Sequence, residues 1–257
     1  MKIAIMGAGA YGTALGNILT ENGHMVKYYD PFVLETTLNE ALDGAEMVLE
    51  VVPSMALVDT LKQLPKDKPL VVATKGILSD EIFNGFKKVM VLSGPGFADE
   101  IKARKETCLT LTDKTLEGLF KADYMRFDYT TDVKGVLMCG ALKNVYAILA
   151  GYLGLLPGGE DYELFISEVL EEMRTLLSAN GAQPQTVDLY CGIGDLRLTC
   201  DTPSRNYQYG LKLRDGGALP NNTTVEGLAA LQSIRDGAIK VPSKLDRLEQ
   251  ITRIVWG

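Results

Sequence analysis

The N-terminal strand of this chain runs directly into a glycine-rich turn. Residues 2–6 are followed by a GxGxxG motif and then by a small-residue helix over residues 13–19. In such a unit the first glycine permits the tight turn, the second lets backbone N–H groups approach a pyrophosphate, and the third lets helix and strand pack closely. The helix N-terminus then faces the phosphates with its partial positive charge. The pattern predicts a dinucleotide site, and the alternative is a tight turn without a ligand. The residues expected to line it are Gly7, Gly9, Ala10, Tyr11 and Gly12.

A second predicted strand, residues 25–29, ends in Asp30. An acid at this position can accept hydrogen bonds from both ribose hydroxyls of NAD, and its charge repels the 2′-phosphate of NADP. No arginine follows Asp30, since the next residue is Pro31. We therefore expect NAD as the preferred cofactor. The alternative is that Asp30 only begins the Asp30-Pro31 turn.

Composition argues against several other classes of protein. The 257 residues are 46% hydrophobic and 23% charged, which is typical of a globular protein with a sizeable core. The formal net charge of −7 argues against a nucleic-acid surface. The four cysteines form no CxxC pair and the chain has one histidine, so no metal site is expected. Free cysteines without an export signal favour the cytoplasm.

One apolar stretch, residues 136–156, is about long enough to cross a bilayer. It carries Lys143 and Asn144 near its middle, and a central lysine costs roughly 2.5–3.5 kcal/mol on an insertion scale. We therefore interpret the stretch as a buried core helix with a functional lysine, and we expect no membrane span.

Apolar strands alternate with helices as far as about residue 131, which indicates an α/β Rossmann-type doubly wound sheet. The later strands are candidates for antiparallel pairing at the edge. Beyond this point long helical stretches dominate, at residues 133–155, 162–179, 224–236 and 242–255. We therefore predict a dinucleotide-binding domain over residues 1–131 and an all-α substrate-binding domain over residues 132–257.

Ligands of open α/β sheets bind at the carboxyl ends of the strands. Several expected strands end in residues suited to binding, and we expect these to line one crevice that the helical domain closes: Gly7–Gly12, Asp30, Pro53-Ser54, Lys75-Gly76 and Gly94–Phe97. Loops are expected at residues 157–161 and between residues 215–217 and 220–222.

A nicotinamide enzyme needs a group that exchanges a proton with the oxygen of its substrate. His24 falls in the turn before the second strand, so a histidine-based mechanism is not expected. Lys143 is the best candidate, because desolvation in an apolar helix lowers the pKa of a lysine. The alternative is a lysine that reaches the surface.

Two later segments add polar groups. Asp195 lies in a glycine-flanked turn, where it is either the partner of Lys143 or a helix N-cap. Ser204, Arg205 and Asn206 offer a hydroxyl, a guanidinium and an amide together, a combination that suits a phosphate group.

Taken together, these segments resemble the NAD(P)-dependent glycerol-3-phosphate dehydrogenases of the soluble bacterial type. The glycine turn is generic, whereas the lysine, aspartate and arginine segments in this order are specific to that family. The matching segments run through most of the chain, at residues 7–15, 52–54, 74–76, 92–98, 140–145, 194–200, 204–206 and 225–227.

The resemblance implies an oxidoreductase of EC class 1.1.1 that interconverts dihydroxyacetone phosphate and sn-glycerol 3-phosphate, feeding glycerophospholipid synthesis. It implies that Lys143 exchanges the proton, that Lys75 contacts substrate and cofactor, and that Asp195 orients Lys143. The implied substrate contacts are Gly94, Gly96, Thr199, Ser204, Arg205 and Asn206. The implied cofactor contacts outside the glycine turn are Asp30, Pro53, Lys75, Ala98, Arg205 and Glu226.

The chain also departs from the family pattern. It is shorter than usual members, and Gly96 stands where they usually have a serine that touches the substrate. Two alternatives therefore stay open: a related lysine-dependent dehydrogenase of another small hydroxyacid or phosphorylated substrate, and a non-catalytic NAD-binding sensor. A homodimer formed through the apolar helices of the second half is a further expectation.

Overall fold

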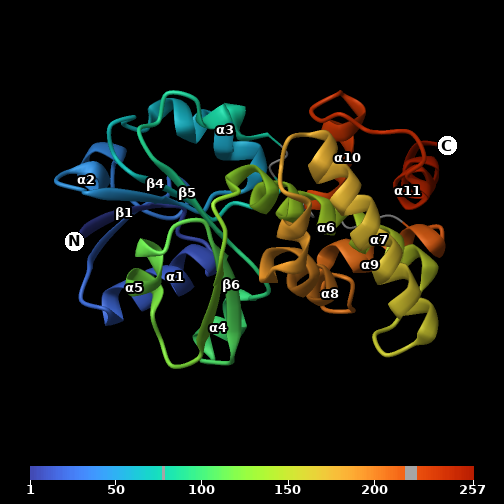
Figure 1. Cartoon of the computed structure of the whole chain (residues 1–257). Coiled ribbons are helices and arrows are strands. Elements are labelled where there is room, and N and C mark those ends of the chain that lie inside the picture. Colours follow the sequence, from blue (N-terminus) through green and yellow to red (C-terminus); the bar gives the residue numbers. More distant parts are fainter. Residues whose placement is uncertain (77–78, 218–224) are drawn as a thin grey trace. The chain divides into compact units, whose positions relative to one another are not determined.

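The computed structural model describes residues 1–76, 79–217 and 225–257, which form two compact units (Figure 1). Unit 1 contains Met1–Lys75 and Asp80–Val133, and unit 2 contains Gly76–Ser79 and Lys134–Gly257. The chain passes between them close to the boundary expected from the sequence. The assignment of cofactor binding to residues 1–131 and substrate binding to residues 132–257 stays a prediction.

Unit 1 is built on a seven-stranded sheet with the order β2-β1-β3-β4-β5-β6-β7. The strands from β1 to β5 pair in parallel, β6 is antiparallel to β5, and β7 is parallel to β6. This arrangement confirms the Rossmann-type sheet and the antiparallel pairing of a later strand. The strands are β1 (Lys2–Met6), β2 (Met25–Tyr29), β3 (Met47–Glu50), β4 (Leu70–Val72), β5 (Val89–Ser93), β6 (Thr107–Leu111) and β7 (Met125–Tyr129).

The order of the strands creates a switch point in this sheet. From β1 the chain first moves to β2 on one side and then to β3 on the other. Ligands of open α/β sheets bind at such a point, outside the carboxyl ends of the strands. The segments that follow β1 and β3 are therefore placed for ligand binding.

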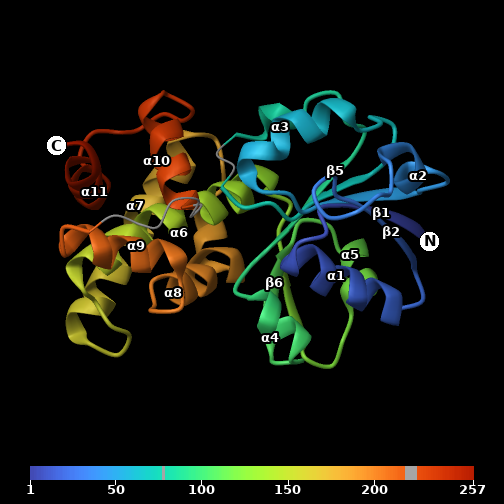
Figure 2. The ribbon, with the colours of Figure 1, turned by 180° about the vertical axis from the view of Figure 1, so that it is seen from behind.

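Helices cover both faces of the sheet (Figures 1 and 2). On one face lie α1 (Ala10–Glu21), α4 (Ala98–Lys102) and α5 (Thr115–Phe120), whose buried apolar side chains form a core with those of the strands. On the other lie α2 (Leu38–Leu42) and α3 (Ser54–Gln63). A short 3₁₀ helix, η1, spans Asp80–Phe83.

Helix α2 begins later than the sequence pattern predicts. The pattern of residues 33–42 predicts a helix over this whole range, but residues 33–36 are not helical. The reason is a capping box: Thr37 Oγ1 accepts a hydrogen bond from the Glu40 N–H, and the Glu40 carboxylate accepts one from the Thr37 N–H. This pair satisfies backbone donors at the helix start and fixes where the helix begins.

The regular secondary structure in the described part of unit 2 is all helical. The α-helices are α6 (Val133–Leu153), α7 (Glu160–Ala179), α8 (Asp195–Thr199), α9 (Arg205–Arg214), α10 (Glu226–Arg235) and α11 (Asp246–Trp256). A 3₁₀ helix, η2 (Pro184–Asp188), and a π-helical segment, η3 (Tyr190–Gly194), precede α8. The predicted all-α character of this half is confirmed; α9 was not among the expected helices, and α8 was expected only under the alternative that Asp195 is a helix N-cap.

Two boundaries in unit 2 differ from the expected ones, and others lie outside the described residues. Glu160 and Asp161 belong to the first turn of α7 rather than to a loop, since acidic groups are favourable at a helix N-terminus. The last helix begins at Asp246 rather than Pro242, because Lys244 has a φ of 72° and interrupts the helical backbone. The expected loop residues 220–222 and the expected helix start at Thr224 lie outside the described residues.

Helix α6 is the central element of unit 2. Residues 135–151 are all buried. Its length and mean hydropathy of 1.5 would suit a membrane span, but 89% of the apolar window is buried inside the protein. Close approach of α9 depends on Gly210, where a Cβ would lie 1.9 Å from the Ile148 carbonyl oxygen. The finding supports the interpretation of α6 as a core helix.

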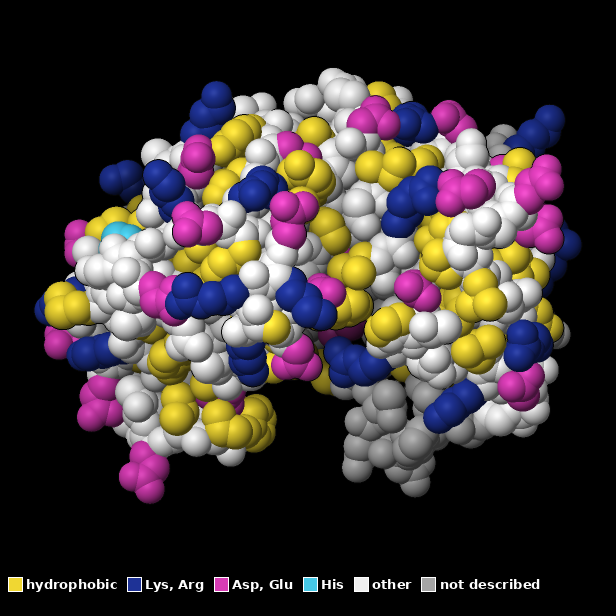
Figure 3. Space-filling model, turned by 90° about the horizontal axis from the view of Figure 1, so that it is seen from below, with side chains coloured by type: hydrophobic (Ala, Val, Ile, Leu, Met, Phe, Trp, Pro, Cys, Tyr) yellow, Lys and Arg dark blue, Asp and Glu magenta, His cyan; other side chains and the backbone are white. Residues whose placement is uncertain are grey.

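Surface charges of both signs are mixed in each unit. In Figure 3, Lys and Arg side chains lie next to Asp and Glu side chains on the face shown. Ion pairs of this kind include Lys88–Asp113, with Nζ–Oδ2 at 2.7 Å, and Arg197–Glu163, with Nη2–Oε2 at 2.6 Å. Exposed pairs such as Arg197–Glu163 add little to stability, so the fold rests mainly on its two buried cores.

Candidate active site

The glycine turn between β1 and α1 has the geometry of a phosphate-binding loop. Gly7 has a φ of 106°, and a Cβ there would lie 2.7 Å from the Val51 carbonyl oxygen. A Cβ at Gly12 would lie 2.3 Å from the Gly7 carbonyl oxygen, whereas one at Gly9 would meet nothing within 4 Å. The open space at Gly9 fits the close approach of a pyrophosphate.

The start of α1 adds a positive electrostatic potential that suits the phosphates of a dinucleotide. Gly9 is the N-cap of α1, and no side chain caps this end. Ala10 is exposed and Tyr11 is partly exposed at the first turn, while Gly12 is buried against the strand. The N–H groups of the first turn and the helix dipole are therefore available to an anion, so these residues fit the nicotinamide dinucleotide predicted from the sequence.

Asp30, which directly follows β2, stabilises the glycine turn by a hydrogen bond. Its Oδ2 accepts a hydrogen bond from the Ala8 N–H at 2.9 Å, and its Oδ1 accepts one from the Phe32 N–H at 3.1 Å. The second bond is the turn contact that we considered as the alternative to ribose binding. Each carboxylate oxygen has a further lone pair, so these two hydrogen bonds leave Asp30 able to accept bonds from a bound ribose.

Three further predicted cofactor and substrate residues follow the ends of β3, β4 and β5. Pro53 is exposed and precedes α3, and Lys75 donates a hydrogen bond from Nζ to the Gly94 carbonyl oxygen at 3.1 Å. Ala98 is the first residue of α4. The sheet thus brings the predicted residues of unit 1 to the carboxyl ends of its parallel strands.

Two glycines allow close packing beyond β5. A Cβ at Gly94 would lie 2.5 Å from the Cys108 carbonyl oxygen, and one at Gly96 would lie 2.8 Å from Thr107 Cγ2. The absence of a side chain at Gly96, where the family resemblance implies serine, therefore accompanies a tight contact with β6. Any residue larger than glycine at Gly96 would require Thr107 to move.

Sequence reasoning missed one ionisable group in this region. Glu50, the last residue of β3, is fully buried, and its Oε1 is 2.8 Å from the Val52 N–H nitrogen and 2.5 Å from Thr74 Oγ1. Burial raises the pKa of Glu50 to about 7, against the opposing effect of these hydrogen bonds. The available signal was a single acid in an otherwise apolar strand.

In unit 2, Lys143 lies in a buried polar cluster with Asp195 and Thr199. Lys143 Nζ donates to Asp195 Oδ1 at 2.7 Å and to Thr199 Oγ1 at 2.9 Å. Thr199 Oγ1 in turn donates to the Asp195 carbonyl oxygen at 2.6 Å. Exposed fractions are 4% for Lys143, 1% for Asp195 and 5% for Thr199, so Lys143 does not reach the surface.

This cluster joins α6 to α8 and places an ammonium group in a low-dielectric environment. Asp195 is the first residue of α8 and Gly194 is its N-cap, so the alternative that Asp195 caps the helix is wrong. Next to the cluster, burial raises the pKa of the Cys200 thiol, although the charge of Lys143 opposes the shift. The thiol therefore stays neutral, and Lys143 and Asp195 form the ion pair of this cluster.

The three residues of the predicted phosphate-binding segment, 204–206, have different surroundings. Ser204 caps α9, its Oγ accepting from the Tyr207 N–H at 3.4 Å, and it is buried. Arg205 is exposed in the first turn of α9 and has no ion-pair partner among the residues that the structure describes. A free guanidinium beside a helix N-terminus suits an anionic group.

Asn206 connects three helices. Its Nδ2 donates to Asn144 Oδ1 at 2.9 Å, and its Oδ1 accepts from the Gly227 N–H at 3.0 Å. A Cβ at Gly227 would lie 2.4 Å from the Asn144 carbonyl oxygen, so glycine is required for this approach. Glu226, the partly exposed first residue of α10, is thereby fixed relative to Lys143 on α6.

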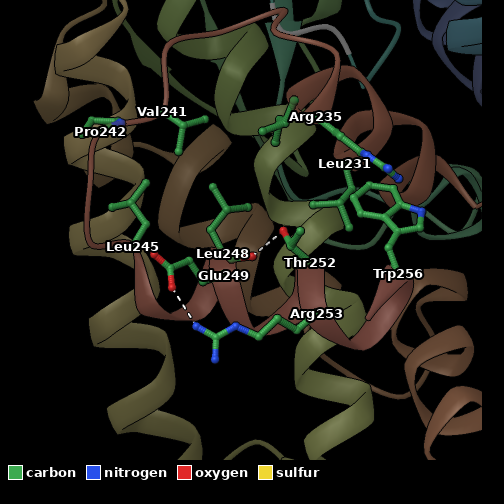
Figure 4. A pocket seen from close by; sticks show the side chains of 11 residues that line it. Leu231, Arg235, Val241, Pro242, Leu245, Leu248, Glu249, Thr252, Arg253 and Trp256 are labelled. Atoms are coloured by element: carbon green, nitrogen blue, oxygen red, sulfur yellow. Dashed lines mark hydrogen bonds and ion pairs between the residues drawn. The ribbon is translucent and has the colours of Figure 1, made fainter.

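A separate cavity of about 320 Å³ lies between α10 and α11 (Figure 4). Leu231, Leu245 and Leu248 line it, and the Arg235 guanidinium lies 4.8 Å from the centre of the Trp256 ring. It contains none of the predicted site residues. The described part of the chain also holds no cluster of three or more residues suited to a metal ion.

Comparisons with known proteins agree with this geometry. Residues 132–257 match the family model for the NAD-dependent glycerol-3-phosphate dehydrogenase C-terminus, and residues 2–31 and 27–118 match the model for its N-terminus. These matches cover most of the chain.

Relatives with curated names agree with the models. The chain is 33% identical to a glycerol-3-phosphate dehydrogenase [NAD(P)+] of Citrifermentans bemidjiense, over 99% of this chain and 92% of the relative. It is 30% identical to that of Alcanivorax borkumensis, over 98% and 89%. A crystal structure of glycerol-3-phosphate dehydrogenase from Coxiella burnetii superposes with a TM-score of 0.83 at 27% identity, covering 99% of this chain and 94% of that one. The chain therefore belongs to the NAD-dependent glycerol-3-phosphate dehydrogenase family.

Proposed function

We propose that this protein interconverts dihydroxyacetone phosphate and sn-glycerol 3-phosphate with a nicotinamide cofactor. The observation that carries the proposal is the buried Lys143–Asp195–Thr199 cluster, with an Nζ–Oδ1 distance of 2.7 Å, in a chain of this family. The product of the reduction is the backbone of glycerophospholipids, so we place the protein in their synthesis.

The proton transfer is assigned to Lys143. In the reduction, the ammonium group of Lys143 donates a proton from Nζ to the substrate carbonyl oxygen as that carbon receives hydride. In the oxidation, the neutral amine accepts the proton of the substrate hydroxyl. Asp195 and Thr199 hold Nζ in place by the hydrogen bonds described above. The bound nicotinamide supplies the hydride in one direction and accepts it in the other.

The substrate phosphate is assigned to the N-terminus of α9. Arg205 would bind it through the guanidinium, and the backbone N–H groups of the first turn would add to the positive potential. The Asn206 amide is engaged by Asn144 and Gly227, so we assign it chiefly to holding the loop in shape. Ser204 would support the same end of the helix as its cap.

Cofactor binding is assigned to the glycine turn, Pro53, Lys75, Ala98 and the region around Glu226. We propose that NAD is preferred over NADP, because the Asp30 carboxylate lies beside the glycine turn and would repel a 2′-phosphate. A comparison of kcat/KM for NADH and NADPH tests this preference, and an equal value for both would contradict it.

The function is tested by following NADH oxidation with dihydroxyacetone phosphate. We compare the wild type with Lys143→Ala, Lys143→Arg and the exposed control Lys240→Ala. The arginine variant can still pair with Asp195 but cannot release its proton near neutrality, so it separates proton transfer from folding. We expect both Lys143 variants to lose about 10²–10⁴-fold in kcat, as removal of a general acid does, and the control to keep wild-type activity.

Other outcomes would point to the alternatives. Turnover of a non-phosphorylated hydroxyacid faster than of dihydroxyacetone phosphate would favour a related lysine-dependent dehydrogenase; the lack of a side chain at Gly96 is the feature that makes this comparison worthwhile. Tight NADH binding without turnover of any substrate would favour a sensor.

A further inference from the structure

Glu50 is a buried acid that the proposed mechanism does not use. It lies in the middle of the sheet, where the same register places Met6 on β1 and Val72 on β4 beside it. Neither neighbour is titratable. The segment after β4 carries Lys75, whose Nζ donates to the Gly94 carbonyl oxygen, and the shifted pKa of Glu50 has no contribution from a nearby cation. The charge of Glu50, if present, is thus not matched by a cation in these contacts.

The Thr74 hydroxyl makes two short oxygen–oxygen contacts near Glu50, and each contact needs a proton between its oxygens. Thr74 Oγ1 lies 2.5 Å from Glu50 Oε1 and 2.6 Å from the Val52 carbonyl oxygen. A threonine hydroxyl carries one proton and cannot donate to both oxygens. If Glu50 is ionised, one of these two short contacts holds no hydrogen, and two oxygen atoms face each other with lone pairs only.

Protonation of Glu50 resolves the conflict. Its Oε1–H then donates to Thr74 Oγ1, and the Thr74 hydroxyl donates to the Val52 carbonyl oxygen. The Val52 N–H still donates to Oε1 at 2.8 Å, and the Thr74 N–H also donates to the Glu50 carboxyl group. Every close contact in the group then contains a hydrogen, and Oε2, which has no hydrogen-bond partner in the described structure, remains a neutral carbonyl oxygen.

This chain of hydrogen bonds includes Val52, whose backbone nitrogen lies 3.4 Å from the position of a Cβ at Gly7 in the glycine turn. It joins the segment after β3, which leads to Pro53, to the segment after β4, which leads to Lys75. The segment after β3 also supports the glycine turn, because the Val51 carbonyl oxygen lies against Gly7 and the Val51 N–H donates to the Met6 carbonyl oxygen at 2.9 Å. A change at Glu50 is therefore transmitted to two of the proposed cofactor-binding segments.

We propose that Glu50 is a positioning residue whose proton holds these two segments together, so that NADH affinity depends on the protonation of Glu50. The inference rests on the proposed function in taking Pro53, Lys75 and the glycine turn as cofactor contacts. Burial raises the pKa of Glu50 to about 7, so the proton is lost near neutral pH. Ionisation would separate Thr74 from Val52 and place a negative charge on the strand next to Val51, which contacts the glycine turn proposed to bind the anionic cofactor.

The coupling between NADH binding and protonation of Glu50 is reciprocal. If protonated Glu50 favours NADH, then bound NADH must favour protonated Glu50 and cause proton uptake near pH 7. Wild-type affinity for NADH should therefore fall as pH rises through this range, whereas a variant without a titrating group at this position should lack that dependence.

The experiment measures the Kd of NADH by fluorescence titration between pH 6 and pH 8.5. The variants are Glu50→Gln, Thr74→Val and Thr74→Ser, and the matched control is Glu46→Gln, an exposed acid just before β3. We expect the wild-type and control Kd to rise at least about fivefold over this range, and the Glu50→Gln value to change less than about twofold. Thr74→Val should weaken binding already at pH 6, and Thr74→Ser should restore it.

A second measurement covers the case in which Glu50→Gln does not fold. Infrared spectra of the wild-type protein with isotopically labelled glutamate should show the carbonyl band of a protonated carboxylic acid that titrates near pH 7 and shifts when NADH binds. Absence of such a band overturns the inference, as does an equal pH response of NADH affinity in wild type and Glu50→Gln. Failure of every form to bind NADH at any pH would overturn the proposed function as well.

Discussion

At the scale of single residues, Glu50 makes stability depend on pH in a defined direction. Its pKa is about 7 in the folded chain and 4.5 for an ordinary glutamate, so between these values the folded state binds more protons than the unfolded state. The contribution of Glu50 is therefore fully present below pH 4.5 and is lost as pH rises through about 7. The shift corresponds to about 3 kcal/mol.

We expect this loss to appear in the difference between wild type and Glu50→Gln. Other titrating groups affect both proteins equally, so urea unfolding of both at pH 5 and pH 8 isolates the effect of residue 50. The free energy of unfolding of the wild type should fall relative to the variant by about 2–3 kcal/mol between these pH values. A difference that does not change with pH would show that Glu50 is ionised throughout.

The glycines of the turn separate folding from cofactor binding. Gly9 has a φ of −67° and open space at its Cβ position, so Gly9→Ala should fold as the wild type does. The added methyl group would occupy the space needed by the pyrophosphate, and we expect NADH affinity to fall at least about tenfold. The control is Gly118→Ala in α5, where a Cβ also meets nothing within 4 Å.

Gly12→Ala should behave differently, because its Cβ would lie 2.3 Å from the Gly7 carbonyl oxygen. Thermal unfolding and NADH titration of the three variants distinguish the cases. Unchanged NADH affinity in Gly9→Ala would place the cofactor elsewhere. A wild-type melting temperature in Gly12→Ala would contradict the packing described here.

At the scale of elements, Glu172 on α7 fixes the start of α11. Its Oε1 accepts from the Arg247 N–H at 2.6 Å, and its Oε2 accepts from the Leu248 N–H at 3.0 Å and from the Tyr146 hydroxyl at 2.9 Å. Leu245, the N-cap of α11, supplies no side-chain bond of its own. Burial and the nearby Glu172 hold the pKa of Tyr146 well above its ordinary value, so this hydroxyl remains a donor.

Loss of Glu172 should therefore destabilise unit 2. Glu172→Ala leaves two buried donors and one partly buried donor without a partner, and we expect a loss of about 2–4 kcal/mol in the free energy of unfolding. Tyr146→Phe removes one donor and should cost about 1 kcal/mol. Glu171→Ala, next to it but exposed, should change stability by less than about 0.5 kcal/mol. Equal urea midpoints for Glu171→Ala and Glu172→Ala would show that α11 does not depend on this contact.

The elements also show what the sequence can and cannot predict. The strands β1 and β2 agree with the expected ranges, because each is a short run with strand-forming residues bounded by turns. Helix α2 was placed too early although its T-x-x-E signal was present, since the preceding apolar residues continue a helical pattern. Helix α9 was missed because its mostly polar sequence carries little apolar periodicity.

The site was predictable to the extent that it depends on residue types. The sequence singled out Lys143 and Asp195, and the structure pairs them at 2.7 Å. It could not show that Asn206 is held by Asn144 and Gly227, or that Thr74 lies 2.5 Å from Glu50. Such contacts join residues distant in the chain, and only the packed fold determines them.

At the scale of the whole molecule, the proposed reaction uses residues of both units. The groups assigned to the cofactor lie mainly in unit 1, at the ends of β1 to β5, whereas those assigned to proton transfer and to the phosphate lie in unit 2. Variants in the two units should therefore affect different kinetic constants. Arg205 is the residue that tests this division, because the resemblance assigns it to the phosphate and also places it near the cofactor.

We expect Arg205→Ala to raise the KM for dihydroxyacetone phosphate at least about tenfold, since loss of a charge-assisted bidentate contact removes about 1.5–3 kcal/mol. It should also reduce the preference for dihydroxyacetone phosphate over dihydroxyacetone, which lacks the phosphate. The control is Arg214→Ala at the other end of α9, where the side chain pairs with Asp215 at 3.0 Å. The Kd of NADH should change less than the KM in Arg205→Ala. If instead only NADH affinity falls and the preference for the phosphorylated substrate stays intact, Arg205 serves the cofactor and the phosphate lies against other groups.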